Sequence, residues 1–520
     1  MLGADNQPPS GEPPHSSGPP NPPSSGPPDS HSPHSANRLV LKNTLFLVGA
    51  KLLTAPLSVV VTAIIARYLG AADYSYIYLA STFTGFGMLC VIFGQSGALP
   101  AMVAVDRKRA GELLGTSLVW RLAIGGIVYG VLALACVVLG YDLVFHKALA
   151  LVFIAGIITA LAGAAVETIR GFERTDVDAY MNVGAAFLTA AITIPLVLLG
   201  GGLMLVLSVG LVTSTASVIF VSRFLRPVGV PRLSASRATL KELLERGYPF
   251  FFFSLAAALQ PTVDAAFLSR LAPAEAVGWY AASAKLEGLI VYPASALVTA
   301  LYPTLCRLYG DHREQFNQTT RATLQTAALL TVPVAAICGF FPELGYVVYG
   351  SGEFREVADN LRVLSLHLFL VYMSMPLGSA ILAAGRARAW SLVQALCVLV
   401  SAIVDPLVIP WFQTNMGNGG LGVCWASVAS EILMLSLGVW LLPRGVLTIG
   451  MARPLLSALA GGVSMGVVAW LLSGLSLWLA GAAALIAYAI TLWLTGALNR
   501  DQVAFLKSIA RRKRQPDAAG

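Results

Sequence analysis

The sequence predicts an all-α, polytopic membrane protein of about 14 transmembrane helices, arranged as two parallel six-helix lobes with two extra helices. Three observations lead to this prediction. Of the 520 residues, 56% are hydrophobic and 12% are charged, whereas soluble proteins contain about 25% charged residues. Apolar stretches of about 20 residues, long enough to cross a bilayer, recur along nearly the whole chain. Segments of the second half also resemble segments of the first.

Two other fold classes are excluded by the same composition. A soluble helical protein would need more polar residues than this chain has to cover its surface. An outer-membrane barrel would alternate apolar and polar residues over strands of about 10 residues, rather than remain apolar for 20.

The apolar stretches divide the chain into spans and flanking segments. Fourteen spans are predicted, at residues 44–66, 77–103, 113–139, 147–168, 180–200, 203–224, 248–269, 278–303, 320–342, 361–384, 390–411, 421–442, 454–473 and 477–498. The expected domains are a disordered Pro/Ser/Gly-rich cytoplasmic tail (1–37), an N-lobe (38–225), a cytoplasmic linker (226–247), a C-lobe (248–443), two further spans (444–499) and a basic cytoplasmic tail (500–520).

Two local signals refine this division. Within the linker, Thr239 and Glu242 have the spacing of a capping box and predict a short amphipathic helix. Basic residues gather in alternate loops, among them 107–109 and 226–246. The positive-inside rule therefore places the N-terminus in the cytoplasm, and an even number of spans returns the C-terminus there.

An internal repeat supports the two-lobe arrangement. Residues 67–81 resemble residues 270–283, and the Ala-Leu-Pro ending at Pro100 is echoed by Ala-Leu-Tyr-Pro ending at Pro303. Both matches are about 203 positions apart. Because each copy contains an even number of spans, the lobes have the same orientation, and transporters built in this way bind substrate between their halves.

The helical hairpin at 262–303 carries charges inside its apolar runs, at Asp264, Lys285 and Glu287. Each such charge costs about 2.5–3.5 kcal/mol at the membrane centre unless it is paired or faces a wet cavity. Asp264 and Lys285 have similar predicted depths, so they either form a structural salt bridge or serve a cavity. Glu287 lies about 200° around the helix from Lys285, and a carboxylate left unpaired is a candidate to bind the coupling ion, H+ or Na+.

Lys51, Arg67 and Arg270 are weaker candidates for the same cavity. The alternative interpretation is that Lys51 extends towards the membrane interface and that both arginines anchor the outer ends of their spans. Other ionisable residues in the spans have structural interpretations. Arg121, Glu167 and Glu431 are expected to be interfacial, and Asp405 is expected to cap backbone groups freed by Pro406.

Several stretches resemble a known family over about residues 38–500. They are ARYLGAADY at the end of the first span, FGQSGALP, LKELLERGYPFFFFSL and VGWYAASAKLEGLIVYPASALVTALYPTL. Together they resemble the oligosaccharide flippases (Wzx-like) of bacterial polysaccharide biosynthesis, in the multidrug/oligosaccharidyl-lipid/polysaccharide exporter superfamily. The related lipid II flippases have an arginine-rich first helix. That pattern is not matched here, where the first span offers Lys51 and Arg67.

The resemblance implies a V-shaped, two-lobe transporter in the bacterial cytoplasmic membrane. It would move a polyprenyl-pyrophosphate-linked oligosaccharide to the outer leaflet by alternating access. The alternatives are a cation- or proton-coupled drug or metabolite antiporter of the same superfamily and a lipid II flippase. Membrane lipids, a polysaccharide polymerase and glycosyltransferases are the expected partners.

No enzymatic activity is expected, since the largest predicted outside loop, 343–360, contains no recognisable catalytic or metal-binding pattern. Catalytic residues, a metal site, a cofactor and a nucleic-acid partner are likewise not expected. The six cysteines lack the spacing of metal ligands and are interpreted as small apolar residues.

Overall fold

The computed structural model of the chain describes residues 33–350, 352–472, 474 and 476–496. Contacts divide the chain into two units, residues 1–45 and 46–520, and the description below concerns the second unit. Most of the predicted tail 1–37 and all of the predicted tail 500–520 lie outside the described residues.

The described residues form helices and no strands, which confirms the all-α class. The helices are α1 (Pro33–Ile92), α2 (Gln95–Val105), α3 (Ala110–Val138), α4 (Leu143–Gly171), α5 (Asp176–Leu198), α6 (Leu203–Val228), α7 (Arg237–Leu271), α8 (Ala274–Asp311), α9 (Arg313–Phe340), α10 (Leu344–Tyr349), α11 (Val357–Ala383), α12 (Ala387–Met416), α13 (Gly419–Leu441), α14 (Ala452–Leu471) and α15 (Leu477–Leu494), with 3-10 turns at Arg107–Arg109 and Ile449–Met451. By length and composition, 11 of the described helical stretches can cross a membrane.

The 14 predicted spans correspond to 14 long helical segments once the kink in α1 is taken into account. Gly70 has φ 84° and ψ 171° and separates two helical segments within α1. The first of the membrane-crossing stretches, Leu53–Val105, therefore contains two spans. This polytopic architecture is the one that the sequence predicts.

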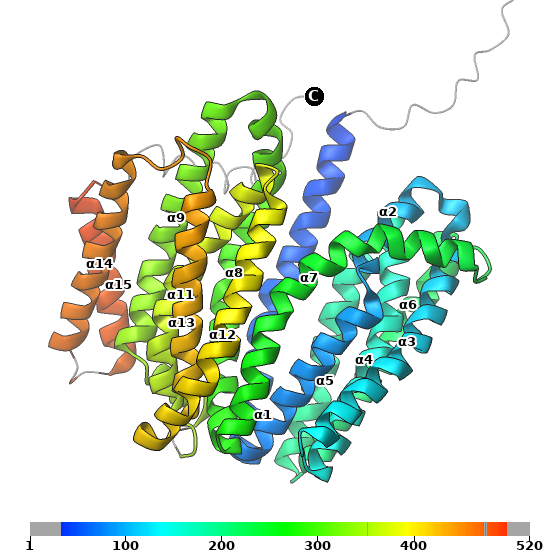
Figure 1. Cartoon of the computed structure of the whole chain (residues 1–520), viewed down its shortest axis with the longest axis horizontal. Helices are drawn as coiled ribbons and strands as arrows, with labels where there is room; N and C mark the ends of the chain where they lie inside the picture. The colour runs from blue at the N-terminus through cyan, green and yellow to red at the C-terminus, as the bar shows by residue number, and fades with distance from the viewer. Residues whose placement is uncertain (1–32, 351, 473, 475, 497–520) are drawn as a thin grey trace, which may run out of the picture. The chain divides into compact units, whose positions relative to one another are not determined.

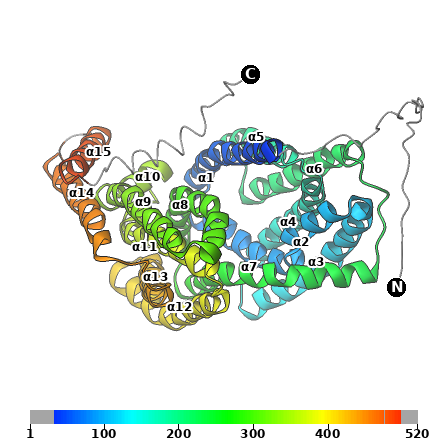
Figure 2. The same cartoon turned by 90° about the horizontal axis from the view of Figure 1, so that it is seen from above.

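The helices gather into an N-lobe bundle and a C-lobe bundle (Figures 1 and 2), and each lobe has its own buried core. In the N-lobe, α4 packs against α2, α3 and α6 around a cluster that includes Leu99, Leu114 and Ile169. In the C-lobe, α11 packs against α8, α9 and α13. The two additional helices, α14 and α15, pack against each other and against α9, where Met465 and Tyr488 are buried.

The span predicted at 77–103 is interrupted in the structure. Its helix ends at Ile92 and a new helix starts at Gln95, because Phe93 and Gly94 both have positive φ, at 46° and 69°. Gly94 lies so close to α7 that an added Cβ would be 2.0 Å from the Gly247 carbonyl oxygen. The break therefore allows the backbones of α2 and α7 to approach each other.

Helix α7 also differs from the prediction of a separate linker helix. It runs without interruption from Arg237 to Leu271, so the expected lobe boundary at 247/248 falls inside it. Its first turns belong to the N-lobe, where Leu243 is fully buried. The predicted capping box is wrong, because the helix starts before Thr239, whose hydroxyl instead donates a hydrogen bond to Glu112.

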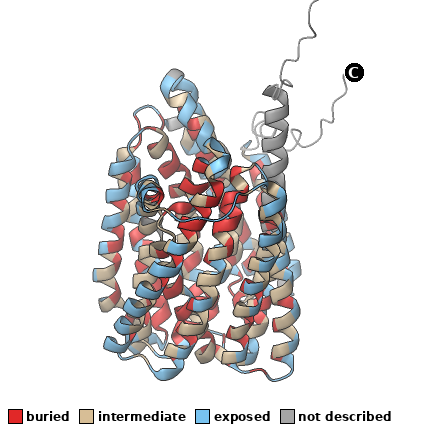
Figure 3. Cartoon of the chain, turned by 90° about the vertical axis from the view of Figure 1, so that its right-hand side faces the viewer, coloured by how far each residue is buried: buried red, intermediate tan, exposed pale blue. Residues whose placement is uncertain are grey.

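Large apolar side chains cover much of the helix surface. They include Leu199 and Trp440, whose side chains are 86% and 80% exposed. Figure 3 shows buried residues inside the helical bundle and exposed ones along its outer faces. Soluble monomers rarely expose contiguous apolar surface on this scale, so these faces are suited to lipid.

Candidate functional site

An open cavity of about 1080 Å³ is lined by α1, α5 and α8, with Arg170 at the end of α4. On α5 and α8 the lining residues recur every three or four positions, so each of these helices contributes a single face. On α1 these residues include Thr54, Ser58 and Thr62. Since Arg170 and Thr175, at the α4–α5 connection, also line it, the cavity extends to the end of the molecule where the basic loops lie.

Lys285 places a positive charge in this cavity from α8. Its side chain is exposed, and Ala284, Gly288 and Tyr292 line the cavity beside it. Among the described residues Lys285 has no ion-pair partner, so the alternative of a salt bridge with Asp264 is not realised. A lysine without a carboxylate partner is available to an anionic ligand.

Asp264 lies elsewhere, in a buried carboxyl pair between α7 and α12. The Ser401 hydroxyl donates to Asp264 Oδ1 at 2.7 Å and lies 3.4 Å from Asp405 Oδ2. Both carboxyl groups are nearly inaccessible, and Asp405 Oδ1 has no hydrogen-bond partner within the described structure. The expectation that Asp405 caps backbone groups is wrong, because its side chain faces Asp264 and Ser401.

Glu287 points away from the cavity and forms an ion pair with His367 of α11. Glu287 Oε1 and His367 Nδ1 are 2.6 Å apart. This arrangement agrees with the predicted angle of about 200° between Lys285 and Glu287. One face of α8 thus lines the cavity while the opposite face is bound to the C-lobe. The buried Glu431, which accepts a hydrogen bond from Ser374, also belongs to the C-lobe interior.

Arg67 joins the two lobes near the kink of α1 instead of lining the cavity. Its Nε donates to the Val348 carbonyl at 2.8 Å, and its Nη2 donates to the Val347 carbonyl, at the end of α10. In the opposite direction, the Ala71 amide donates to Glu353 Oε2 at 3.0 Å. The Arg67 cation thus binds carbonyls at the C-terminal end of α10, and the Glu353 carboxylate binds the first amide after the kink in α1. Both arrangements complement the helix dipole.

Arg270 lies over the ring of Tyr141, with its guanidinium carbon 5.6 Å from the ring centroid. The Tyr141 hydroxyl is 2.5 Å from the Ser269 hydroxyl, which joins the α3–α4 connection to α7. The neighbouring buried cluster contains Phe83 and Phe145 from the N-lobe and Leu268 and Tyr280 from the C-lobe. These contacts close the lobe interface at the end opposite the basic loops. The remaining candidate, Lys51, has a side chain outside the described residues.

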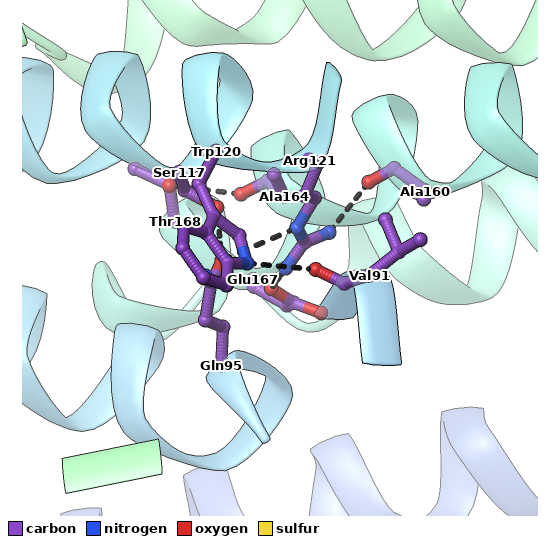
Figure 4. Close-up of polar contacts among 9 residues, drawn as sticks. All are labelled: Val91, Gln95, Ser117, Trp120, Arg121, Ala160, Ala164, Glu167 and Thr168. Atoms are coloured by element: carbon purple, nitrogen blue, oxygen red, sulfur yellow. Dashed lines mark hydrogen bonds and ion pairs between the residues drawn. The ribbon is translucent and has the colours of Figure 1, made fainter. Parts of the chain in front are cut away.

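Arg121 and Glu167 form a buried charge pair inside the N-lobe (Figure 4). Arg121 Nη2 donates to Glu167 Oε2 at 2.6 Å, and Nη1 donates to the Ala160 carbonyl at 2.5 Å. Arg121 Nε and the Ser117 hydroxyl both donate to Gln95 Oε1, at 3.3 and 2.6 Å. The prediction that Arg121, Glu167 and Glu431 are interfacial is therefore wrong.

Sequence reasoning also missed His367 and the participation of Asp405 in a pair. Both are ionisable residues inside predicted apolar spans, and that is the signal that could have identified them. Their partners could not be inferred, because they come from helices far away in the sequence.

Comparison with known proteins relates this architecture to membrane transporters. The family described as polysaccharide biosynthesis protein matches residues 40–309, just over half of the chain. The MatE family matches residues 249–407. No curated protein matches the chain.

Solved structures share the fold at low sequence identity. A lipid II flippase MurJ in an inward closed conformation has TM-score 0.67 and 14% identity, covering 88% of this chain and 99% of its own. An inward-facing multidrug resistance MATE family transporter of the MOP superfamily has TM-score 0.61 and 16% identity, covering 74% and 94%. The MATE multidrug transporter DinF-BH has TM-score 0.56 and 19% identity, covering 78% and 95%. This chain is a multi-pass membrane protein with the fold of these transporters, and it belongs to the polysaccharide biosynthesis protein family.

Proposed function

We propose that this protein is an alternating-access flippase that moves a polyprenyl-pyrophosphate-linked oligosaccharide across the bacterial cytoplasmic membrane for cell-surface polysaccharide biosynthesis. The observation that carries the proposal is the cavity of about 1080 Å³, whose α8 wall holds Lys285, a lysine with no ion-pair partner among the described residues. Cavities for drug-sized ligands measure about 300–1,000 Å³, so this one lies at the upper end of that range and has room for a pyrophosphate with its first sugars. An ammonium group is a common ligand for phosphate.

The lobe interface is closed at one end and open at the other, which supports an inward-facing state. Arg67 and Glu353 join the lobes at one end, and the cavity extends to the other end, where Arg170 lies. The basic loops lie at that second end, so the positive-inside rule assigns it to the cytoplasm, with both termini on the same side. A lipid-linked substrate would therefore enter from the inner leaflet and leave after the Arg67–Glu353 end opens.

The coupling ion is proposed to act at the Asp264–Asp405 pair. Two carboxylates that share one buried serine repel each other, so one must hold a proton or both must share a cation. Asp405 Oδ1, which no described residue hydrogen-bonds, provides an oxygen for either ion. Asp264→Asn and Asp405→Asn are expected to abolish the dependence of transport on a Na+ or pH gradient in proteoliposomes, while the wild-type protein responds to one of them.

Deletion of the gene tests the substrate class directly. Cells without the protein are expected to lose one surface polysaccharide and to accumulate its lipid-linked precursor on the cytoplasmic side. Unchanged surface glycans together with altered drug tolerance would instead favour an efflux antiporter. Accumulation of lipid II with loss of cell-wall integrity would favour the lipid II alternative.

A further inference from the structure

The two walls of the cavity differ in chemistry. On the C-lobe wall, α8 presents Lys285 beside Tyr292 and small or apolar residues. The N-lobe wall is polar where α4 meets α5, and we name this cluster of Arg170, Thr175, Asp178 and Asn182 the polar wall. A single ligand that bridges the cavity would therefore meet a cation on one side and mixed donors and acceptors on the other.

The polar wall is held together by internal bonds that cancel its charge. Arg170 Nη2 forms an ion pair with Asp178 Oδ2, and Asn182 Nδ2 donates to Asp178 Oδ1 at 2.8 Å. Asp178 is only 4% exposed, which fixes the cluster to the lobe, whereas Asn182 is exposed. With its positive charge neutralised in this way, the polar wall is less suited to phosphate than the unpaired Lys285.

The same cluster retains unused hydrogen-bonding capacity. Arg170 Nε and the Thr175 hydroxyl are buried and have no hydrogen-bond partner within the described structure. Asn182 uses its amide nitrogen for Asp178, which leaves its side-chain oxygen as an acceptor facing the cavity side of α5. The Arg170–Asp178 ion pair carries no net charge, and the exposed amide of Asn182 is the group that the hydroxyl and amide groups of sugars can reach.

We propose that the polar wall is the glycan subsite, binding the hydroxyl groups of the first sugars while Lys285 binds the pyrophosphate. This inference rests on the proposed function and adds an orientation of the head group, with sugars towards α5 and pyrophosphate towards α8. It also makes the N-lobe the source of glycan specificity. Sites that hydrogen-bond a substrate hydroxyl discriminate strongly against ligands that lack it.

Binding of two lipids to the purified full-length protein in nanodiscs tests the assignment. The probes are undecaprenyl pyrophosphate and the lipid-linked oligosaccharide extracted from the deletion strain. The wild-type protein is expected to prefer the glycosylated lipid by at least about tenfold in Kd. Asn182→Ala and Asp178→Asn are expected to remove most of this preference without weakening the binding of undecaprenyl pyrophosphate.

The chain offers a matched control for the aspartate. Asp176 also pairs with an arginine, Arg174, at 2.8 Å, but neither residue lines the cavity. Asp176→Asn is therefore expected to keep the wild-type preference. Lys285→Ala is expected to weaken the binding of both lipids.

The outcomes separate the two proposals. If the wild-type protein binds both lipids and folded Asn182→Ala protein keeps the full preference, the glycan subsite is overturned and the flippase proposal stands. Equal weakening of both lipids by Asn182→Ala would overturn it as well. If the wild-type protein binds neither lipid, the proposed function fails, and the glycan subsite fails with it. Because Asn182 is exposed, its variant remains informative even if Asp178→Asn does not fold.

Discussion

The pair formed by Arg121 and Glu167 shows how the N-lobe accommodates charge within the membrane. Arg121 is fully buried, and its guanidinium group makes hydrogen bonds to Glu167, Gln95 and the Ala160 carbonyl. Removing charged groups from water costs several kcal/mol per ion, which a good geometry recovers only while both partners are present. Loss of one member of the pair is therefore expected to lower stability more than loss of both.

Arg121→Met is expected to destabilise the protein by about 3–5 kcal/mol, because it leaves Glu167 as an unpaired buried charge. The double variant Arg121→Met/Glu167→Met is expected to be more stable than the single variant. Thermal unfolding of the detergent-solubilised proteins measures both. A double variant that is no more stable than Arg121→Met would contradict this account of the pair.

At the residue scale, the sequence located the ionisable residues inside the spans, but it did not predict their partners. The spacing of Lys285 and Glu287 correctly predicted opposite faces of one helix, since helical geometry is local. The partners of Asp264 and Glu287 come from α12 and α11, 137 and 80 positions away. The hairpin sequence alone suggested an ion pair between Asp264 and Lys285. It could not show that Asp264 bonds instead to Ser401, which belongs to another helix.

At the scale of the elements, α1 depends on a backbone conformation that only glycine adopts readily. Gly70 has φ 84° and ψ 171°, and an added Cβ would lie 2.6 Å from Glu353 Oε2. Other residues pay about 1–3 kcal/mol in such a region of φ/ψ space. Gly70 therefore allows the chain to turn between two spans and allows its backbone to approach Glu353 of the C-lobe closely.

Gly70→Ala is expected to lower stability by about 1–3 kcal/mol and to weaken the contact with Glu353. Gly85, in the same helix, has open space around its Cα. Gly85→Ala is therefore the control and is expected to be neutral or slightly stabilising, since alanine favours helix over glycine. Equal unfolding temperatures for Gly70→Ala and the wild-type protein would show that the kink does not require glycine.

The sequence did not predict that α7 is a single continuous helix. The apolar run predicted a span from 248, and the polar run before it predicted a separate short helix. The structure joins them, because Leu243 is buried in the N-lobe and Gly247 packs against the backbone of Phe93 and Gly94. Tertiary contacts of this kind, such as those of Gly247 with residues about 150 positions away, leave no periodic signal in the local sequence.

At the scale of the whole transporter fold, the Arg67 and Glu353 contacts hold one end of the lobe interface closed. Arg67→Ala removes the hydrogen bonds to the Val347 and Val348 carbonyls, and Glu353→Gln weakens the hydrogen bond from the Ala71 amide by removing the carboxylate charge. Each change is expected to cost about 0.5–1.5 kcal/mol. Since about 1.4 kcal/mol is a tenfold change in an equilibrium, the combined variant is expected to increase the outward-open population severalfold to more than tenfold.

Labelling of a cavity cysteine from outside the cell measures this population. Thr62→Cys, in a background without the six native cysteines, places a thiol on the cavity wall. A membrane-impermeant maleimide is expected to label it faster in the Arg67→Ala/Glu353→Gln protein. Arg355→Ala, a change at an exposed neighbouring arginine, is the control. Unchanged labelling of the double variant would mean that these contacts do not keep the interface closed.

The most direct test of the account is the flipping of extracted lipid-linked oligosaccharide in proteoliposomes. The wild-type protein is expected to move it across the bilayer, and Lys285→Ala to reduce the rate at least tenfold at equal protein abundance, with partial recovery in Lys285→Arg. Lys241→Ala removes an exposed lysine outside the cavity and is expected to keep the wild-type rate. Wild-type flipping by Lys285→Ala, or no flipping by the wild-type protein, would contradict the account.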